Sequence, residues 1–224
     1  MMKMAKKICN LKLLHFSILA SLYAINPAHA GHMQKILPAK QLKKIQHEYD
    51  QETSARFNSW NQLMSDSKNK TDAEKLELVN NFFNQMKWTE DQELWKQKDY
   101  WATPIESLIR NAGDCEDFSI AKYFTLLELG IPVDHLKVSY VQVKETRQAH
   151  MVLAYYEDDH ADPLILDNMK TQIVRGSERS DLAPMFHFNG EGVWSKDSPG
   201  TRVDSALKIR NWADLMQRLD QEQS

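Results

Sequence analysis

The stretch Gly113-Asp114-Cys115-Glu116-Asp117-Phe118 places a cysteine among acidic residues at the point where a helix is expected to begin. This helix is predicted from about Cys115 to Leu129, because Gly130 and Pro132 then end the pattern. At the first turn of a helix, free backbone N–H groups and the helix dipole favour the thiolate, which is the form of cysteine that attacks carbonyls. The same N–H groups can receive an oxyanion. The stretch therefore predicts a candidate nucleophile at Cys115.

A cysteine nucleophile needs a base, and the base needs a group that orients it. His150 begins a predicted strand, Asp167 ends the next one, and the acidic turn 157–159 lies between them. If the two strands pair as a hairpin, a start and an end lie at the same edge of the sheet. A Cys115 helix packed across that edge would bring the three side chains together. Three other histidines compete for the base role, although none begins an apolar strand: His135, His160 and His187.

Asp114, Glu116 and Asp117 support two interpretations. Acids in the first turn of a helix serve as cap and dipole partners. Three carboxylates around a thiol also raise its pKa and weaken it as a nucleophile, and a hard divalent cation such as calcium would offset this effect. The spacing is not that of an EF-hand loop, so the residues alone leave both interpretations open.

Each catalytic candidate also has a purely structural interpretation. A lone cysteine is by default a buried, inert residue. A histidine at a strand start, such as His150, can simply be a hydrogen-bonded side chain, and Asp167 can be a turn or cap residue. The ordered set of Cys115, His150 and Asp167 carries more weight than any member alone.

The first thirty residues predict a signal peptide. Four lysines precede the apolar stretch Leu13 to Ile25, and Ala28-His29-Ala30 has the small-x-small pattern of a cleavage site. The apolar stretch is short and interrupted for a membrane span, although an uncleaved anchor is the alternative. We therefore expect residues 1–30 to be removed, and residues 31–224 to form a single domain in the periplasm.

Removal of this leader has consequences for charge and for sulfur. The whole chain has a net charge of −3 and the leader carries four lysines and no acids, so the exported chain has −3 − 4 = −7. This balance argues against nucleic acid or an anionic membrane surface as a partner. Cys9 leaves with the leader, so Cys115 cannot form a disulfide within the exported chain. In an oxidising compartment such a thiol is either deeply buried or used for its reactivity.

Helical patterns fill the first part of the predicted domain and strand patterns fill the second. Apolar spacing predicts helices over 38–64, 71–86, 104–110, 115–129 and 205–219. Alternating or β-branched runs predict strands over 136–143, 149–156 and 163–166, with weaker signals at 172–174 and 190–194. This order predicts an α+β fold in which helices pack on a short antiparallel sheet.

Several of these segments together resemble a known family. The motifs are Trp101-Ala102-Thr103-Pro104-Ile105-Glu106 leading into 113–117, then Ala149-His150-Met151-Val152-Leu153 and Leu166-Asp167-Asn168. In these motifs the chain resembles the bacterial transglutaminase-like cysteine proteinases of the LapG type, over roughly residues 70–180. The resemblance implies a papain-like, transglutaminase-like fold and a periplasmic location. It also implies a Cys115–His150–Asp167 triad and a Ca²⁺ site at Asp114 and Glu116, with Asp117 as a further ligand.

The resemblance also implies a substrate and a regulator. Members of this family cleave large RTX-type surface adhesins near the N-terminus, at a small-residue site with paired alanines, and the cut disperses biofilm. A membrane-bound cyclic-di-GMP receptor of the LapD type holds them inactive through its periplasmic domain. Two other functions fit the same residues: a transglutaminase-like acyltransferase or amidase with the same triad, and a non-catalytic binding module. Intact Cys, His and Asp residues argue against the binding module.

Overall fold

The structure is a computed structural model that describes residues 36–158, 161–196 and 201–223. The predicted signal peptide and its cleavage site lie outside the described residues, as does His160. Within the described ranges, no helix combines the length and the apolar character that a membrane crossing requires.

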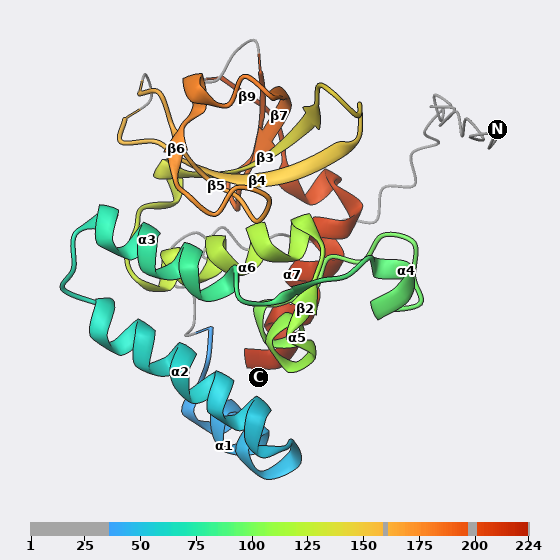
Figure 1. The fold of residues 1–224 in the computed structure, drawn as a ribbon. Helices are drawn as coiled ribbons and strands as arrows, with labels where there is room; N and C mark the ends of the chain where they lie inside the picture. Colours follow the sequence, from blue (N-terminus) through green and yellow to red (C-terminus); the bar gives the residue numbers. More distant parts are fainter. Residues whose placement is uncertain (1–35, 159–160, 197–200, 224) are drawn as a thin grey trace, which may run out of the picture.

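Helices occupy one side of a curved sheet, and helix α6 lies between the sheet and the other helices (Figure 1). The helices are α1 (Ala39–Glu48), α2 (Gln51–Ser67), α3 (Asp72–Phe83), α4 (Asp91–Leu94), α5 (Pro104–Arg110), α6 (Cys115–Glu128) and α7 (Arg210–Gln223). The predicted arrangement of helices on an antiparallel sheet is confirmed.

Capping residues set the starts of the helices. The Thr71 and Glu74 side chains form a capping box at the start of α3, and Thr103 and Glu106 form a second one that begins α5. The helical pattern over 38–64 divides into two helices, because the Asp50 carboxylate accepts the Thr53 N–H at 2.7 Å and starts α2 there. The apolar spacing continues across this break, which is why periodicity alone does not detect it.

The main sheet has seven strands in the order β6-β5-β4-β3-β7-β8-β9, and all its pairings are antiparallel. The strands are β3 (Leu136–Val143), β4 (Ala149–Tyr155), β5 (Leu164–Leu166), β6 (Val174–Arg175), β7 (Leu182–Phe188), β8 (Val193–Ser195) and β9 (Arg202–Asp204). Strand β7 was not predicted, because Pro184 interrupts its pattern. Its pairing with β3 shifts register near Pro184, between Tyr140 and Val141, and such an irregularity accommodates a proline.

A second, small sheet matters for the site. Strands β1 (Lys87–Trp88) and β2 (Ala112–Gly113) pair in parallel, and the Thr89 N–H donates to the Gly113 carbonyl at 2.9 Å. This pairing places the segment that leads into α4 directly beside the segment that leads into α6. Residues far apart in the sequence are thereby brought to the start of the cysteine helix.

Aromatic packing fixes α6 in position. Trp212 of α7 is 1% exposed, stacks on Phe124 at 5.6 Å and meets Phe188 of β7 edge-on at 5.2 Å. On the other side, Trp60 of α2 donates its indole N–H to the Thr125 hydroxyl at 3.1 Å. Each such buried aromatic side chain contributes on the order of 2–3 kcal/mol through burial. The helix that carries the cysteine is therefore held from three sides.

The C-terminal helix also contacts the chain just before the cysteine. The Thr103 hydroxyl donates to Glu222 at 2.6 Å, and the Arg218 guanidinium donates to the Trp101 carbonyl. Between these two residues, the Ala102 N–H donates to the Asp117 carboxylate of α6 at 2.8 Å. The end of the chain thus supports the loop that borders the first turn of α6.

Candidate active site

Cys115 is the first residue of α6 and lies against the start of β4. The Ser119 hydroxyl lies 2.9 Å from the Cys115 carbonyl oxygen and 3.0 Å from the Met151 carbonyl oxygen, and so ties the first turn of α6 to the strand. The Met151 N–H lies close enough to the Cys115 sulfur to favour its ionised form. Met151 follows His150 directly, so the structure places the thiol beside the strand start that carries the predicted base.

His150 and Asp167 are in direct contact. The Nε2 atom of His150 lies 2.9 Å from Oδ1 of Asp167, and both side chains are buried. Their strands β4 and β5 pair as the predicted antiparallel hairpin. Because Asp167 engages Nε2, the Nδ1 atom is the one that can exchange a proton with another group. The structure therefore brings two of the three predicted site residues, His150 and Asp167, into direct contact.

Asp167 stays ionised although it is buried. Burial alone would raise its pKa, but the hydrogen bond and charge of His150, the Met169 N–H and the Arg179 guanidinium outweigh burial and hold the pKa below its usual range. A permanent negative charge is therefore present behind the imidazole.

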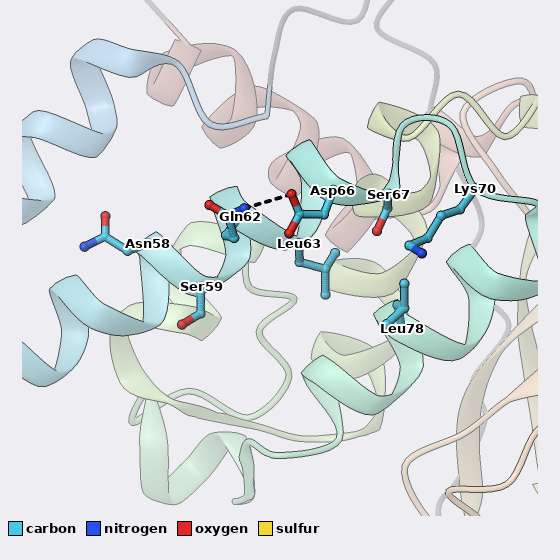
Figure 2. Close-up of a pocket in the computed structure, with 8 residues that line it drawn as sticks. All are labelled: Asn58, Ser59, Gln62, Leu63, Asp66, Ser67, Lys70 and Leu78. Atoms are coloured by element: carbon cyan, nitrogen blue, oxygen red, sulfur yellow. Dashed lines mark hydrogen bonds between the residues drawn. The ribbon is translucent and has the colours of Figure 1, made fainter.

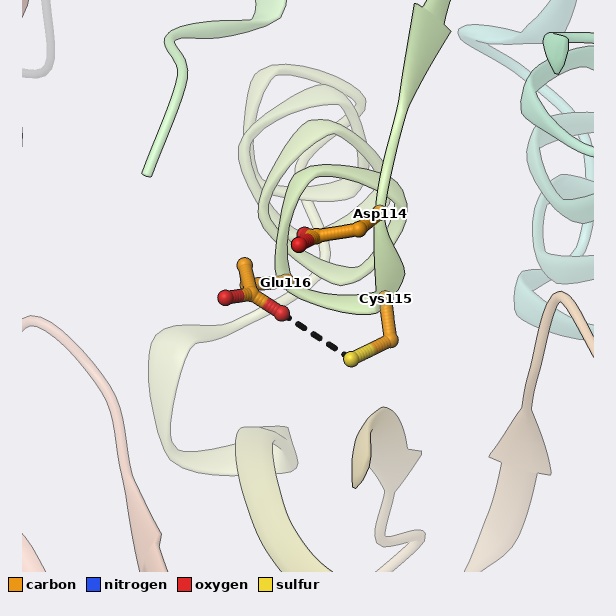
Figure 3. A group of neighbouring side chains, drawn as sticks. All are labelled: Asp114, Cys115 and Glu116. Atoms are coloured by element: carbon orange, nitrogen blue, oxygen red, sulfur yellow. Dashed lines mark hydrogen bonds between the residues drawn. The ribbon is translucent and has the colours of Figure 1, made fainter. Parts of the chain in front are cut away.

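The neighbouring Glu116 disfavours ionisation of the Cys115 thiol. It lies 2.9 Å from Oε2 of Glu116, to which it donates a hydrogen bond (Figure 3). Burial, and then the charge of Glu116 and its hydrogen bond, raise the pKa of the thiol. As the sequence predicts, the surrounding carboxylates disfavour the thiolate.

The carboxylate cluster is larger than the sequence indicated. Asp91, at the start of α4, contributes an oxygen within 4.8 Å of those of Asp114 and Asp117, and together with Asp99 it lies equally close to Glu116. Asp91 and Asp99 were missed because the parallel pairing of β1 with β2 brings them in, and two-residue strands leave no periodic signal. All three predicted acids thus lie in one cluster with two further acids.

This cluster has the properties of a site for a hard cation. Asp91 is 3% exposed, and its Oδ1 atom has no hydrogen-bond partner among the described residues. Burial, as the main cause, raises the pKa of Asp91 to about 6 and that of Asp114 to about 10. An all-oxygen set of several carboxylates is the donor set that calcium prefers. The residues present therefore fit a calcium ion.

Asp117 has a structural role as well. Its two oxygens accept the N–H groups of Ala102 at 2.8 Å and of Asp114 at 3.3 Å. A Cβ atom added at Gly113 would lie 2.6 Å from the Asp117 side chain, so glycine is required there. Each carboxylate oxygen keeps a further lone pair, so capping by Asp117 and binding of a cation are compatible.

Two of the competing histidines, His135 and His187, lie elsewhere. His187 accepts or donates at 2.7 Å to the Ser139 hydroxyl and lines a hollow of about 760 Å³ together with Val141, Val152 and Leu182. Alternate side chains of β4 point to opposite faces of the sheet, and Met151 belongs to the core cluster with α6 while Val152 belongs to a second cluster. His187 is therefore on the face away from α6. His135 packs edge-on against Tyr155. The structure brings neither His135 nor His187 to Cys115 by any described contact.

A further hollow of about 740 Å³ lies between α2 and α3 (Figure 2). Its polar lining includes Gln62, which donates to Asp66 at 2.8 Å, together with Ser67 and Lys70. It shares no residue with the cluster around Cys115. Its side chains offer no nucleophile with a base, so it is not the candidate active site.

A cysteine at a helix start, beside a strand that carries a histidine bonded to a buried aspartate, is the arrangement of the transglutaminase-like, papain-type cysteine proteases. Residues 39–181 match the family described as bacterial transglutaminase-like cysteine proteinase BTLCP, and the chain belongs to this family. The comparison with curated proteins found no match.

Solved structures of one relative are similar over most of the chain. LapG of Legionella pneumophila is 38% identical, with a TM-score of 0.72 over 80% of this chain and 96% of the other. Its EGTA-treated form is 39% identical with a TM-score of 0.74, over 80% and 96% of the two chains. Its calcium-bound form is 39% identical with a TM-score of 0.71, over 80% and 98%. The fold is therefore that of a transglutaminase-like cysteine protease.

Proposed function

We propose that the chain is a calcium-dependent cysteine endopeptidase with Cys115 as nucleophile, His150 as general base and acid, and Asp167 as the orienting carboxylate. The observation that carries this proposal is the buried 2.9 Å contact between His150 and Asp167 beside the first turn of α6. Membership of the cysteine proteinase family supports the reaction class.

In the first half of the reaction, His150 takes the proton of the Cys115 thiol and the sulfur attacks the peptide carbonyl carbon. Backbone N–H groups at the start of α6 stabilise the oxyanion that forms. The carbon–nitrogen bond breaks when His150 gives its proton to the leaving amine. An acyl-enzyme remains on Cys115.

In the second half, His150 takes a proton from water, and the resulting hydroxide attacks the acyl carbon. The carbon–sulfur bond breaks, the new carboxyl product leaves, and the proton returns to the sulfur. Throughout, Asp167 stabilises the imidazolium, while Arg179 and the Met169 N–H hold the carboxylate in place.

A calcium ion would be held by Asp114, Glu116 and Asp117, with Asp91 as a fourth carboxylate ligand. It would supply positive charge beside the thiol and so oppose the carboxylates that now raise the thiol pKa. The existence of calcium-bound and EGTA-treated structures of LapG supports this part of the proposal.

For the biological setting, we propose the periplasm as location and the N-terminal region of a large RTX-type adhesin as substrate. A membrane-bound cyclic-di-GMP receptor of the LapD type is the proposed inhibitor, acting through its periplasmic domain. Resemblance to the LapG family is the support for these three assignments. Co-purification of the chain with such a receptor domain tests the last one, and no binding with or without calcium would count against it.

The test of the proposed activity is incubation with a recombinant adhesin N-terminal fragment that contains paired alanines, with calcium and with EGTA. We expect cleavage by the wild type in calcium, and none in EGTA or by Cys115→Ala. Circular dichroism should show that Cys115→Ala keeps its fold. Hydrolysis by that variant would remove Cys115 from the nucleophile role, and attachment of an added fluorescent amine to the fragment instead of cleavage would favour the acyltransferase.

A further inference from the structure

Arg179 makes a buried ion pair with the side of Asp167 that faces away from His150. The residue ends the short 3-10 helix Gly176–Glu178 and is 4% exposed. Its Nη1 atom lies 2.8 Å from Oδ2 of Asp167. The Oδ1 atom of the same carboxylate accepts the Met169 N–H at 2.9 Å and contacts His150. Three groups from three chain segments therefore fix the orientation of one carboxylate.

The guanidinium is itself held from a second direction. Its Nε atom donates to Oδ1 of Asp181 at 3.0 Å, and its Nη2 atom donates to Oδ2 at 2.9 Å. The fork occupies Nε and Nη2, and the remaining Nη1 atom makes the ion pair with Asp167. An arginine remains charged at any pH at which the protein is folded, and the paired geometry is one that lysine cannot reproduce.

The charge of Arg179 acts on Asp167. Together with His150 and the Met169 N–H, this cation keeps the pKa of the buried carboxyl below its usual range, and the ionised carboxylate is the form that holds the His150 ring. The other charged groups that bear on this pair are Lys122 of α6, which is buried and interacts with Asp167, and Asp181 together with Lys170 at 3.5 Å. Of these cations, only Arg179 has a described contact with the Asp167 carboxylate.

We propose that Arg179 is a positioning residue that holds the Asp167 carboxylate ionised and in place, and so fixes the orientation of the His150 ring. The inference rests on the proposed function of His150 as base and acid, in which the imidazole must both accept and release a proton. An imidazole held in one orientation by a fixed carboxylate serves both steps. The alternative is that Arg179 merely anchors residues 176–182 through Asp181.

The test measures the orientation of the His150 ring without a substrate. In the exported chain with calcium, the Nε2–H resonance of His150, assigned by its loss in His150→Gln, is recorded by NMR at one fixed pH. In Arg179→Met, this resonance is expected to broaden or disappear, because the carboxylate that contacts Nε2 is no longer held on its other side. In Arg179→Lys, which keeps a cation near Asp167, the resonance should remain, while Lys170→Met is the matched surface control.

Kinetics on the adhesin fragment provide the second readout. We expect kcat of Arg179→Met to fall roughly tenfold with KM unchanged, as when a group that orients an imidazole partner is lost. Arg179→Lys should recover most of the lost kcat, because it restores a cation beside Asp167. Asp181→Asn keeps the Arg179 charge but loosens the anchor, so it should leave the Nε2–H resonance unchanged.

Two outcomes would overturn the inference. An unchanged Nε2–H resonance in Arg179→Met, or an equal loss of the resonance in Asp181→Asn, would reduce Arg179 to an anchor for its loop. If Arg179→Met does not fold, the comparison of Arg179→Lys with Asp181→Asn still decides, because a resonance that follows the anchor and not the charge contradicts the proposal. Failure of the wild type to cleave the fragment would instead overturn the proposed function, while the resonance would still report on Arg179.

Discussion

Glu116 disfavours the ionised form of the neighbouring Cys115 thiol. Glu116 accepts a hydrogen bond from the Cys115 thiol at 2.9 Å, and its charge helps burial to raise the pKa of that thiol. In the proposed calcium-bound state, Glu116 would be a ligand of the ion, whereas without the ion it disfavours the thiolate. The proposed calcium dependence would follow from this pair of roles, since removal of the ion would leave an uncompensated carboxylate beside the sulfur.

Glu116→Gln therefore has effects of opposite sign on two measurements. In EGTA, the rate at which iodoacetamide alkylates Cys115 should rise roughly tenfold, because a neighbouring negative charge is gone. Activation of cleavage by calcium should be lost, because a ligand is gone. Mass spectrometry of the peptide that carries Cys115 measures the first effect, with the exposed Glu77→Gln as control, and an unchanged alkylation rate would contradict the assigned role.

Asp91→Asn tests the ligand that the sequence did not reveal. The substitution keeps the shape of a buried side chain but removes one charge from the cation site. We expect calcium binding to weaken by roughly tenfold or more in isothermal titration calorimetry. The exposed Asp66→Asn should bind calcium like the wild type, and equal affinity in Asp91→Asn would place the ion away from α4.

At the scale of secondary-structure elements, the two faces of the central sheet have different chemistry. The α6 face carries the cysteine and the main core, while the opposite face carries the Ser139–His187 pair in a hollow with an apolar floor. Burial, followed by the charge of Lys137, lowers the pKa of His187 to about 4. His187 of β7, which pairs with β3, is therefore kept neutral in the folded protein.

This lowered pKa predicts a loss of stability in acid. The unfolded chain binds a proton at His187 near pH 6.5, whereas the folded protein resists it until about pH 4, so stability falls as the pH drops between these values. At pH 4.5 the loss from this residue is roughly 2–3 kcal/mol. Urea unfolding at pH 7 and pH 4.5 should show a smaller acid loss in His187→Gln, and identical losses in the two proteins would refute the linkage.

The elements that the sequence predicted well are those with a strong local signal. The capping box at Thr71, the helix from Cys115 and the strands on either side of the turn at 157–159 lie close to their predicted positions. The His150–Asp167 contact followed from the hairpin. What was missed depends on contacts distant in sequence: the parallel β1–β2 pairing that delivers Asp91, the Arg179 ion pair, and β7, whose pattern Pro184 interrupts.

At the scale of the whole molecule, the helical layer and the sheet share one aromatic core. Trp212 joins three parts of it, because it contacts Tyr123 and Phe124 of α6 as well as Phe188 of β7. The last helix is therefore part of the core that positions the cysteine helix, although it lies outside the residues matched to the family.

Trp212→Ala should consequently destabilise the entire domain. The loss of a large buried side chain costs on the order of 3–5 kcal/mol, and cleavage should fail at temperatures where the variant unfolds. Thermal unfolding by circular dichroism measures the change. Leu207→Ala, at a position that is 48% exposed, is the control and should shift the melting temperature little. A wild-type melting temperature in Trp212→Ala would mean that α7 is not part of the cooperative unit.

The contacts that Arg218 and Glu222 make with Trp101 and Thr103 bear on how the protein is handled. Both residues lie in the second half of α7, so trimming or modification of this helix acts close to the loop that borders Cys115. Preparations in which α7 is altered should therefore be compared with a protein that keeps this helix before a weak activity is attributed to the site itself.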